Sequence, residues 1–270
     1  MAVKLIASDL DGTLMAPDHM TVTERTKKAL LEAHKKGIKI AIATGRTLRF
    51  TDSVTAQIPF ADYVVSSNGA AVYDRNAGEY VYSTLVPNKI ALEAVEFLNT
   101  LPVHYHIYLG GRIYIQNSAL AYAADTGLPE DFLRDFISRV TLCDSLAEII
   151  GESGVEVIDV FSMGENEKAI TDFFKERNLV MTSAVRGELA ATAIGADKGT
   201  ALNGLCGVLG ISADEVMTFG DAENDCPMLE FAGLSFAMEN GNDACKASAK
   251  AVAPSNAVDG VAQMIEKYAL

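Results

Sequence analysis

The sequence predicts an α/β protein in which a Rossmann-like parallel sheet is interrupted by an inserted α+β domain. Three observations favour this fold. Short apolar strands alternate with helical segments near both ends of the chain, an order typical of parallel sheets with crossover helices. Over residues 83–189 this order gives way to another and then resumes. Polar residues follow the core strands, at the edge where open parallel sheets bind their ligands.

The core is expected to span residues 1–82 and 190–270. Its predicted elements are, in chain order, strand 3–8, helix 22–36, strands 38–43 and 62–66, helix 199–209, strand 215–219, a short helix 225–231, strand 234–238, a segment near 250–253 and a final helix from 258. Thr21 is a candidate N-cap for the first helix, and Gly37 is a stop signal. Strands of four to six apolar residues are typical of a sheet that is covered on both faces.

The inserted segment, residues 83–189, has the texture of a separate α+β domain. Its predicted elements are helix 88–99, a hairpin around Gly110-Gly111, helix 130–138, strand 155–161, helix 165–176 and two further strand-like runs. Strands that are close in sequence favour a mostly antiparallel sheet. Because the core pattern resumes afterwards, the domain is interpreted as inserted rather than appended.

The hairpin "HYHIYLGGRIYIQ" allows a prediction of register. A three-residue loop, Leu109-Gly110-Gly111, pairs Tyr108 with Arg112 and His106 with Tyr114. This register gathers the polar side chains on one face and leaves Ile107, Ile113 and Ile115 for the other. Since a buried face fixes register, the three-residue loop is favoured over a two-residue turn.

Composition excludes several classes of function. The net charge of -14 argues against binding nucleic acid by neutralising phosphates. Four scattered cysteines, without zinc-ligand spacing, favour reduced thiols in a cytoplasmic protein. No apolar run approaches the roughly 20 residues that span a bilayer, so no membrane partner is expected. The sequence leaves the oligomeric state open.

Polar residues gather just after four predicted core strands. They are Asp9 and Asp11, Thr44 and Arg46, Asn68, and Asp221 with Asn224 and Asp225. A single acid after a strand is an ordinary turn signal, but four strand ends with matching chemistry favour a ligand site.

Magnesium-assisted phosphoryl transfer fits this set of residues. Asp9, Asp11, Asp221 and Asp225 would place four negative charges together, and hard carboxylate oxygens suit Mg²⁺. Lys198 and Arg46 are the candidate cations, and the Arg46 fork suits a phosphoryl group. The Thr44 hydroxyl and the backbone amides near Gly12 and Gly45 could hold the remaining phosphate oxygens.

Four segments carry a family resemblance. In order, "DLDGT", "ATGR", "DKG" and "GDAENDCPM" resemble the motifs of the haloacid dehalogenase superfamily of phosphohydrolases. "SSNGA", the late insertion and "DGVAQMIEKY" make the chain similar to the Cof-like sugar phosphatases. The resemblance covers essentially the whole chain. It implies that the insertion is a cap that sets the choice of a small phosphorylated metabolite.

The resemblance also implies a role for each motif residue. Asp9 would be the nucleophile that becomes an aspartyl phosphate, and Asp11 would protonate the leaving oxygen and then activate water. Thr44 and Lys198 would hold the phosphoryl group and the nucleophile. Asp221 would bind magnesium directly, with Asp225 in support. Gly12, Gly45, Arg46, Asn68 and Asn224 stay candidates for substrate or phosphate binding.

Two other functions remain open from the residues. A phosphomutase would use the same aspartyl phosphate but return the phosphoryl group to an intermediate. A receiver-like module would store phosphate on an aspartate as a signal, although a hydrolytic base such as Asp11 beside a stored phosphoaspartate disfavours this. Release of free phosphate from sugar phosphates would separate the three.

Some residues depart from the subfamily or have no predicted role. Ala190 and Ala191 stand where subfamily members commonly carry Glu-Ile, and Glu239 adds an acid to "AMENGND". Both changes are interpreted as influences on substrate entry. His104 and His106 share one strand face; histidines of the cap sheet without a metal are favoured over a metal pair.

Overall fold

The structure is a computed structural model that describes residues 2–126, 129–183 and 187–270. The chain divides into two compact units, Met1–Ser83 with Ala196–Leu270, and Thr84–Gly195. The predicted second boundary, between 189 and 190, falls inside a strand, β11 (Glu188–Thr192). β11 pairs with β9 (Val157–Phe161) of the second unit, so residues 190–195 stay with that unit.

The first unit is built on one mixed sheet. In the described residues the strand order is β14-β13-β12-β1-β2-β3-β4-β5. The bounds are β1 Leu5–Ser8, β2 Lys39–Ala43, β3 Tyr63–Ser66, β4 Ala71–Asp74, β5 Glu79–Ser83, β12 Val216–Gly220, β13 Leu234–Met238 and β14 Ala251–Ala253. The strands from β14 to β3 are parallel, as the sequence predicts. The antiparallel strands β4 and β5 extend the sheet beyond that prediction.

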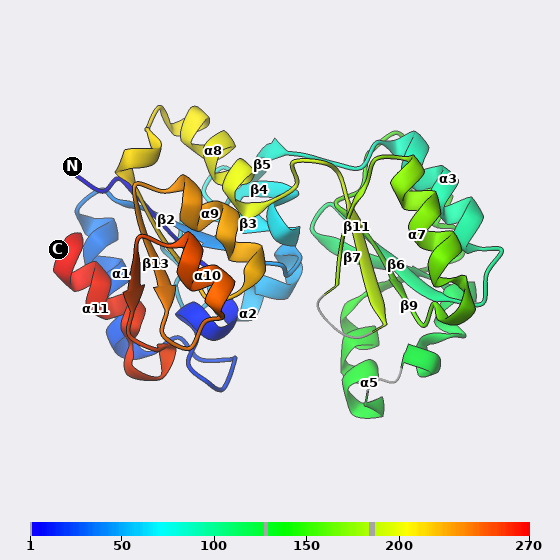
Figure 1. Ribbon diagram of the computed structural model, residues 1–270, viewed down its shortest axis with the longest axis horizontal. Coiled ribbons are helices and arrows are strands. Elements are labelled where there is room, and N and C mark those ends of the chain that lie inside the picture. The colour runs from blue at the N-terminus through cyan, green and yellow to red at the C-terminus, as the bar shows by residue number, and fades with distance from the viewer. Residues whose placement is uncertain (1, 127–128, 184–186) are drawn as a thin grey trace. The chain divides into compact units, whose positions relative to one another are not determined.

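Helices cover both faces of this sheet (Figure 1). The helices are α1 Glu24–Lys35, α2 Asp52–Thr55, α8 Lys198–Leu209, α9 Cys226–Phe231, α10 Asp243–Ser248 and α11 Gly260–Tyr268. α1 and α11 pack with Ile6, Ile40 and Phe219 on one face. α8 and α9 pack with Leu5 and Ala41 on the other. Burial on both faces explains the short, largely apolar strands.

The first helix begins later than predicted. Its N-cap is Thr23, whose hydroxyl accepts a hydrogen bond from the Thr26 N–H, rather than Thr21. Thr21 is held in the preceding loop, where its carbonyl accepts from the Ala16 N–H at 2.8 Å. Two threonines at neighbouring positions are equivalent as capping residues, and the loop contact decides between them.

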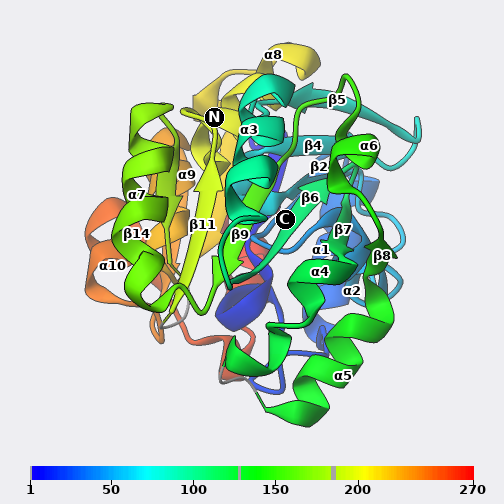
Figure 2. The ribbon, with the colours of Figure 1, turned by 90° about the vertical axis from the view of Figure 1, so that its right-hand side faces the viewer.

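The second unit is an α+β domain with a mostly antiparallel sheet, ordered β10-β11-β9-β6-β7-β8 in the described residues. Its remaining elements are α3 Asn88–Leu98, β6 His104–Leu109, β7 Arg112–Gln116, α4 Asn117–Leu120, α5 Glu130–Arg139, β8 Thr141–Cys143, α6 Leu146–Ile150, α7 Glu167–Glu176 and β10 Val180–Thr182. α3 and α7 pack on one face of this sheet, over Tyr105 and Ile107 (Figure 2).

The predicted three-residue loop of the β6–β7 hairpin is wrong. Tyr108 pairs with Ile113 and Leu109 with Arg112, so the turn is the two residues Gly110-Gly111. Both glycines have positive φ, +57° and +73°, which a two-residue hairpin turn requires. The Gly111 N–H also donates to Glu156 Oε1 at 2.8 Å.

The alternation of polar and apolar residues does not predict the register here, because both faces of the hairpin are largely buried. Ile113 and Ile115 share a face with His106 and Tyr108, while Tyr114 lies with Ile107 in the apolar cluster. His106 is buried and contacts the ring of Phe136 at 5.5 Å. Register therefore follows the turn rather than a polar surface.

The thiols Cys143, Cys206, Cys226 and Cys245 are all free. None of the helices in the described ranges is both long and apolar enough to cross a bilayer.

Candidate active site

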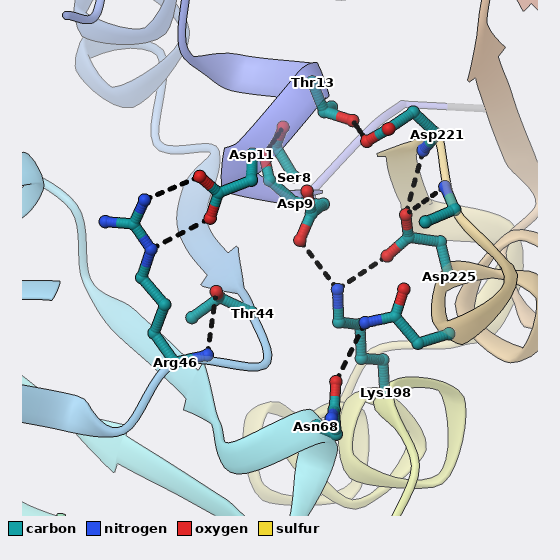
Figure 3. Close-up of polar contacts among 12 residues, drawn as sticks. Ser8, Asp9, Asp11, Thr13, Thr44, Arg46, Asn68, Lys198, Asp221 and Asp225 are labelled. Carbon is teal, nitrogen blue, oxygen red and sulfur yellow. Dashed lines mark hydrogen bonds and ion pairs between the residues drawn. The ribbon is translucent and has the colours of Figure 1, made fainter. Parts of the chain in front are cut away.

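Loops at one edge of the first unit's sheet bring the predicted site residues together (Figure 3). They follow β1, β2, β3 and β12, whose carboxyl ends share that edge because these strands are parallel. The loops carry Asp9, Asp11 and Gly12; Thr44, Gly45 and Arg46; Asn68; and Asp221, Asn224 and Asp225. Lys198 comes from the first turn of α8, which Asp197 caps.

A fully buried lysine stands between two carboxylates at the centre of the site. Lys198 Nζ lies 2.7 Å from Asp9 Oδ1 and 2.6 Å from Asp225 Oδ1. Burial opposes a charge on this lysine, but the negative charges of Asp225 and Asp9 outweigh burial and raise the pKa of Lys198 above its usual value. A charged Lys198 therefore holds the Asp9 carboxylate in one orientation.

Asp225 and Thr13 orient the third acid, Asp221. Asp225 Oδ2 accepts from the backbone N–H groups of Asp221 at 2.9 Å and Ala222 at 3.0 Å. The Thr13 hydroxyl donates to Asp221 Oδ1 at 2.6 Å. Gly12 has φ +80°, and a Cβ there would fall 2.4 Å from Asp221 Oδ2. Glycine is therefore required for the loop after β1 to approach Asp221 this closely.

The acidic group has the donor set of a divalent-cation site. Asp9, Asp221 and Asp225 each offer a carboxylate oxygen, and these atoms lie within 4.8 Å of one another. Hard oxygen ligands from a few carboxylates are what Mg²⁺ takes from proteins, with water and phosphate completing its shell. Three carboxylates also exceed the single charge of Lys198, so the residues present fit such a cation.

The protonation of the acids reflects this excess of negative charge. Burial raises the pKa of Asp9 to about 8; the charges of Asp225 and Asp221 add to this effect, and Lys198 opposes it. The pKa of Asp221 is also raised, again chiefly by burial. A cation held by these carboxylates would favour their ionised forms, including the ionised Asp9 that a nucleophile needs.

Asp11, predicted as a fourth metal ligand, points away from this group. Arg46 Nε lies 2.9 Å from Asp11 Oδ2, and Arg46 Nη2 lies 2.6 Å from Asp11 Oδ1. His19 Nδ1 lies 3.4 Å from the same Oδ1. The guanidinium thus engages both oxygens of the Asp11 carboxylate, and metal binding by this carboxylate stays a prediction. Arg46 contacts this carboxylate here, and its binding of phosphate stays a prediction.

The loops after β2 and β3 are locked to each other. The Asn68 N–H donates to the Thr44 carbonyl at 3.0 Å, and the Ser67 N–H donates to the Arg46 carbonyl at 2.9 Å. Asn68 has φ +55°, uncommon outside glycine. Its Oδ1 accepts from Asn224 Nδ2 at 2.9 Å, which ties these loops to the one after β12. A Cβ on Gly45 would lie 3.0 Å from Asn68 Oδ1.

Three residues without a predicted role also lie at the site. They are Thr13, which binds Asp221, His19, which contacts Asp11, and Asn240, whose Nδ2 donates to the Gly12 carbonyl at 2.7 Å. Thr13 belongs to "DLDGT", and its place directly after Gly12 in that motif could have marked it as a site residue. His19 lies in no motif, and Asn240 belongs to "AMENGND", whose sequence does not show that the fold brings it to Gly12.

The residues that depart from the subfamily lie outside this cluster of side chains. Ala190 and Ala191 belong to β11 in the second unit, where Ala191 is part of the apolar core. Glu239 is exposed, and its N–H donates to the Ala253 carbonyl at 2.9 Å, which continues the β13–β14 ladder.

The two cap-sheet histidines are buried in the second unit. His104 Nδ1 lies 3.1 Å from the Ala119 carbonyl, and burial lowers the pKa of His104 to about 4. His106 Nε2 lies 3.3 Å from Asp159 Oδ2. Among the residues that the structure describes, neither histidine belongs to a metal-like group of ligands.

Comparisons with known proteins agree with this arrangement of motifs. A sequence profile of the haloacid dehalogenase-like hydrolases matches residues 6–265. The chain is 29% identical to the phosphatase YwpJ of Bacillus subtilis, over 98% of this chain and 99% of YwpJ. It is 27% identical to the 5-amino-6-(5-phospho-D-ribitylamino)uracil phosphatase YcsE of the same organism, over 99% of this chain and 96% of YcsE.

A solved structure shows the same fold. A haloacid dehalogenase-like hydrolase from Bacteroides thetaiotaomicron superposes with a TM-score of 0.81 at 23% identity, covering 98% of this chain and 99% of that one. The profile match extends over nearly the whole length, on both sides of the inserted domain. The chain therefore belongs to the haloacid dehalogenase-like hydrolases.

Proposed function

We propose that this haloacid dehalogenase-like phosphatase hydrolyses phosphate monoesters of small metabolites, sugar phosphates in particular, through an aspartyl phosphate on Asp9 and with Mg²⁺ as its metal. The observation that carries the proposal is the 2.7 Å contact between Asp9 and Lys198. The second acid, Asp11, is two residues further along the chain. Asp9 is buried beside a buried lysine, whereas Asp11 is 43% exposed beside the partly exposed Arg46, and such different surroundings suit different tasks.

In the first step an Asp9 carboxylate oxygen attacks phosphorus, and the bond from phosphorus to the ester oxygen breaks. The Asp11 carboxyl gives its proton to the departing oxygen, so an alcohol leaves. In the second step Asp11 takes a proton from water, whose oxygen attacks phosphorus and displaces the Asp9 carboxylate. The products are the alcohol and inorganic phosphate, and both acids return to their starting forms.

The other side chains hold these two acids and the phosphoryl oxygens. Lys198 keeps the Asp9 carboxylate oriented and supplies positive charge next to the attacked group. Thr44, Asn68, Asn224 and the backbone amides near Gly12 and Gly45 would bind the remaining phosphoryl oxygens. Arg46 has to exchange its contact with Asp11 for the substrate before it can act on phosphate.

Asp9, Asp221 and Asp225 would hold the magnesium ion. When bound, the ion supplies the charge that lowers repulsion between an anionic nucleophile and an anionic phosphate. Asp225 would act both through its carboxylate and by fixing the loop of Asp221.

The substrate class is proposed from chemistry and from relatives. YcsE is named for a substrate that joins a phosphate to a ribityl chain, which supports a polyol or sugar phosphate here. The cytoplasmic location and the lack of a nucleic-acid partner stay predictions from cysteine pattern and charge.

Phosphate release by Asp9→Asn tests the proposal, because this variant keeps the shape of the side chain but removes its charge. We expect turnover to fall more than about a thousandfold, equivalent to roughly 4 kcal/mol of barrier. The melting temperature should stay within a few degrees of the parent. Asp214→Asn, an exposed acid of the same unit, is the matched control and should keep full activity.

Mass spectrometry of acid-quenched Asp11→Asn during turnover should detect phosphate on Asp9, because the second step then lacks its base. The parent should release free phosphate and alcohol in equal amounts. An Asp9→Asn variant within about tenfold of the parent would refute the nucleophile. An isomeric phosphate ester in place of free phosphate would favour the mutase.

A further inference from the structure

The loop after β13 contacts the nucleophile loop through Asn240, which belongs to the segment "AMENGND" and has no predicted role. Asn240 Nδ2 donates to the Gly12 carbonyl at 2.7 Å, and Asn240 Oδ1 accepts from the Asn256 N–H at 3.1 Å. A carbonyl and an N–H need opposite ends of the amide, so these two partners fix its orientation. Gly12 lies between Asp11 and Thr13, and the hydrogen bond therefore acts on the turn that carries the proposed acid–base residue.

The same loop also contacts the second acidic strand end. The Asn242 N–H donates to the Asp221 carbonyl at 2.9 Å. A Cβ on Gly241 would lie 2.8 Å from that same oxygen, so the two backbones approach each other too closely for any residue with a side chain. The Asn242 side chain accepts from the Cys245 N–H at 2.8 Å and begins α10, which anchors the loop. Residues 239–242 thus hold both Gly12 and Asp221.

Gly12 needs such a contact because its turn is irregular. Asp11, with φ -77° and ψ +118°, and Gly12, with φ +80° and ψ -6°, leave helical geometry between Leu10 and Leu14. Helical hydrogen bonds therefore do not set the direction of the Gly12 carbonyl. Rotation of this peptide would move Asp11 on one side and the Thr13 hydroxyl, with its bond to Asp221, on the other.

We propose that Asn240 is a positioning residue for phosphoryl transfer: by holding the Gly12 carbonyl it keeps Asp11 and Thr13 in their working places. This role rests on the proposed function, because it assigns Asn240 to that same site. Asn240 is exposed and acts through Gly12, not on the reacting atoms. Loss of alignment of about an ångström can lower a chemical step by up to about a hundredfold, while ground-state binding changes less.

Asn256 offers a matched control. Its own side chain donates to the Met15 carbonyl at 2.9 Å, at the far end of the same loop. Asn256→Ala removes that bond but keeps the backbone N–H that contacts Asn240. Each variant thus deletes one amide-to-carbonyl hydrogen bond from the nucleophile loop, and only Asn240 holds the residue next to Asp11.

Steady-state kinetics on p-nitrophenyl phosphate with Mg²⁺ would compare Asn240→Ala, Asn240→Asp and Asn256→Ala, with Asp9→Asn as the inactive reference. We expect kcat to fall roughly tenfold in Asn240→Ala with KM within about threefold. Asn240→Asp should lose at least as much, because an ionised carboxylate cannot donate to Gly12. Asn256→Ala should keep kcat within about twofold although its melting temperature falls similarly.

A kcat within twofold of the parent in Asn240→Ala, or an equal loss in Asn256→Ala, would overturn the positioning role. Such a result leaves the proposed function intact if the parent releases phosphate and Asp9→Asn does not. A parent without phosphate release would overturn the proposed function and this inference together.

Discussion

The two ends of the parallel sheet both bury carboxylates, and they differ in how the charge is balanced. At the amino end Asp62, 1% exposed, precedes β3 and accepts from Lys39 Nζ at 2.9 Å, the Ile40 N–H at 3.0 Å and Asn76 Nδ2 at 3.3 Å. At the carboxyl end Lys198 contacts Asp9 and Asp225, and Asp221 belongs to the same group of acids.

The difference separates a structural acid from a reactive group. The three hydrogen bonds to Asp62 offset the cost of removing its carboxylate from water. They also join β2, the start of β3 and the β4–β5 turn. Three acids with one lysine cannot all ionise without an excess of negative charge, and the raised pKa values of Asp9 and Asp221 reflect this cost together with burial. The unbalanced end is therefore the one that is suited to bind a cation and a phosphate.

The largest expected difference in stability is between two lysine substitutions, one at each end of the sheet. Lys198→Met leaves buried Asp9 and Asp225 without their cation, and removing one partner of a buried pair typically costs about 3–5 kcal/mol. Lys39 is 42% exposed, and Asp62 keeps two other donors, so Lys39→Met should cost about 1 kcal/mol or less.

Urea unfolding of both lysine variants measures this difference, and activity gives a second reading. Lys198→Met should also abolish phosphate release, whereas Lys39→Met should retain it. Equal losses of stability in the two variants would contradict the distinction between the two ends of the sheet.

The same substitution at one acid of each end should have opposite effects on the metal-free protein. Asp62→Asn replaces one acceptor oxygen by an NH2 group, which would face a donor without an acceptor. The free energy of unfolding should therefore fall by about 1–3 kcal/mol. Asp221→Asn removes one of three repelling charges, so stability should be unchanged or slightly raised.

Thermal melts with and without Mg²⁺ test this pair. The parent and Asp62→Asn should both gain stability from the ion, and Asp221→Asn should lose most of that gain. A full magnesium response in Asp221→Asn would remove Asp221 from the proposed ligands.

The smallest expected effect is a pH dependence that only the unbalanced end produces. Burial raises the pKa of Asp9 to about 8 and also raises the pKa of Asp221. As pH rises, these acids therefore stay protonated in the folded state at pH values where they are already ionised in the unfolded chain. Their contribution to stability is complete below about pH 4 and is lost as pH rises toward 8.

The stabilisation by Mg²⁺ should accordingly grow from pH 5 to pH 8, by about 1 kcal/mol or a few degrees in melting temperature. Differential scanning calorimetry at several pH values measures it. Asp221→Asn should flatten the trend, and a stabilisation that shrinks as pH rises would contradict the raised pKa values.

The sequence by itself determined the alternating core, the inserted domain and the strand ends that carry the site. These features are local: a buried parallel strand must be apolar throughout, and the carboxyl ends of parallel strands share one edge in any such sheet. Asp9, Thr44, Asp221 and Asp225 could therefore be placed near one another before the structure. Lys198 follows no core strand and was a candidate through its charge and the motif resemblance. The nucleophile role came from motif resemblance rather than from these patterns.

Only the tertiary structure decided which side chains face each other. The Asp11–Arg46 contact, the approach of His19 and the hydrogen bond of Asn240 to Gly12 depend on loop paths that no periodicity records. The β6–β7 register was decided by two glycines with positive φ and by burial on both faces. Periodicity reports which residues avoid water, and it loses its information where a strand avoids water on both sides.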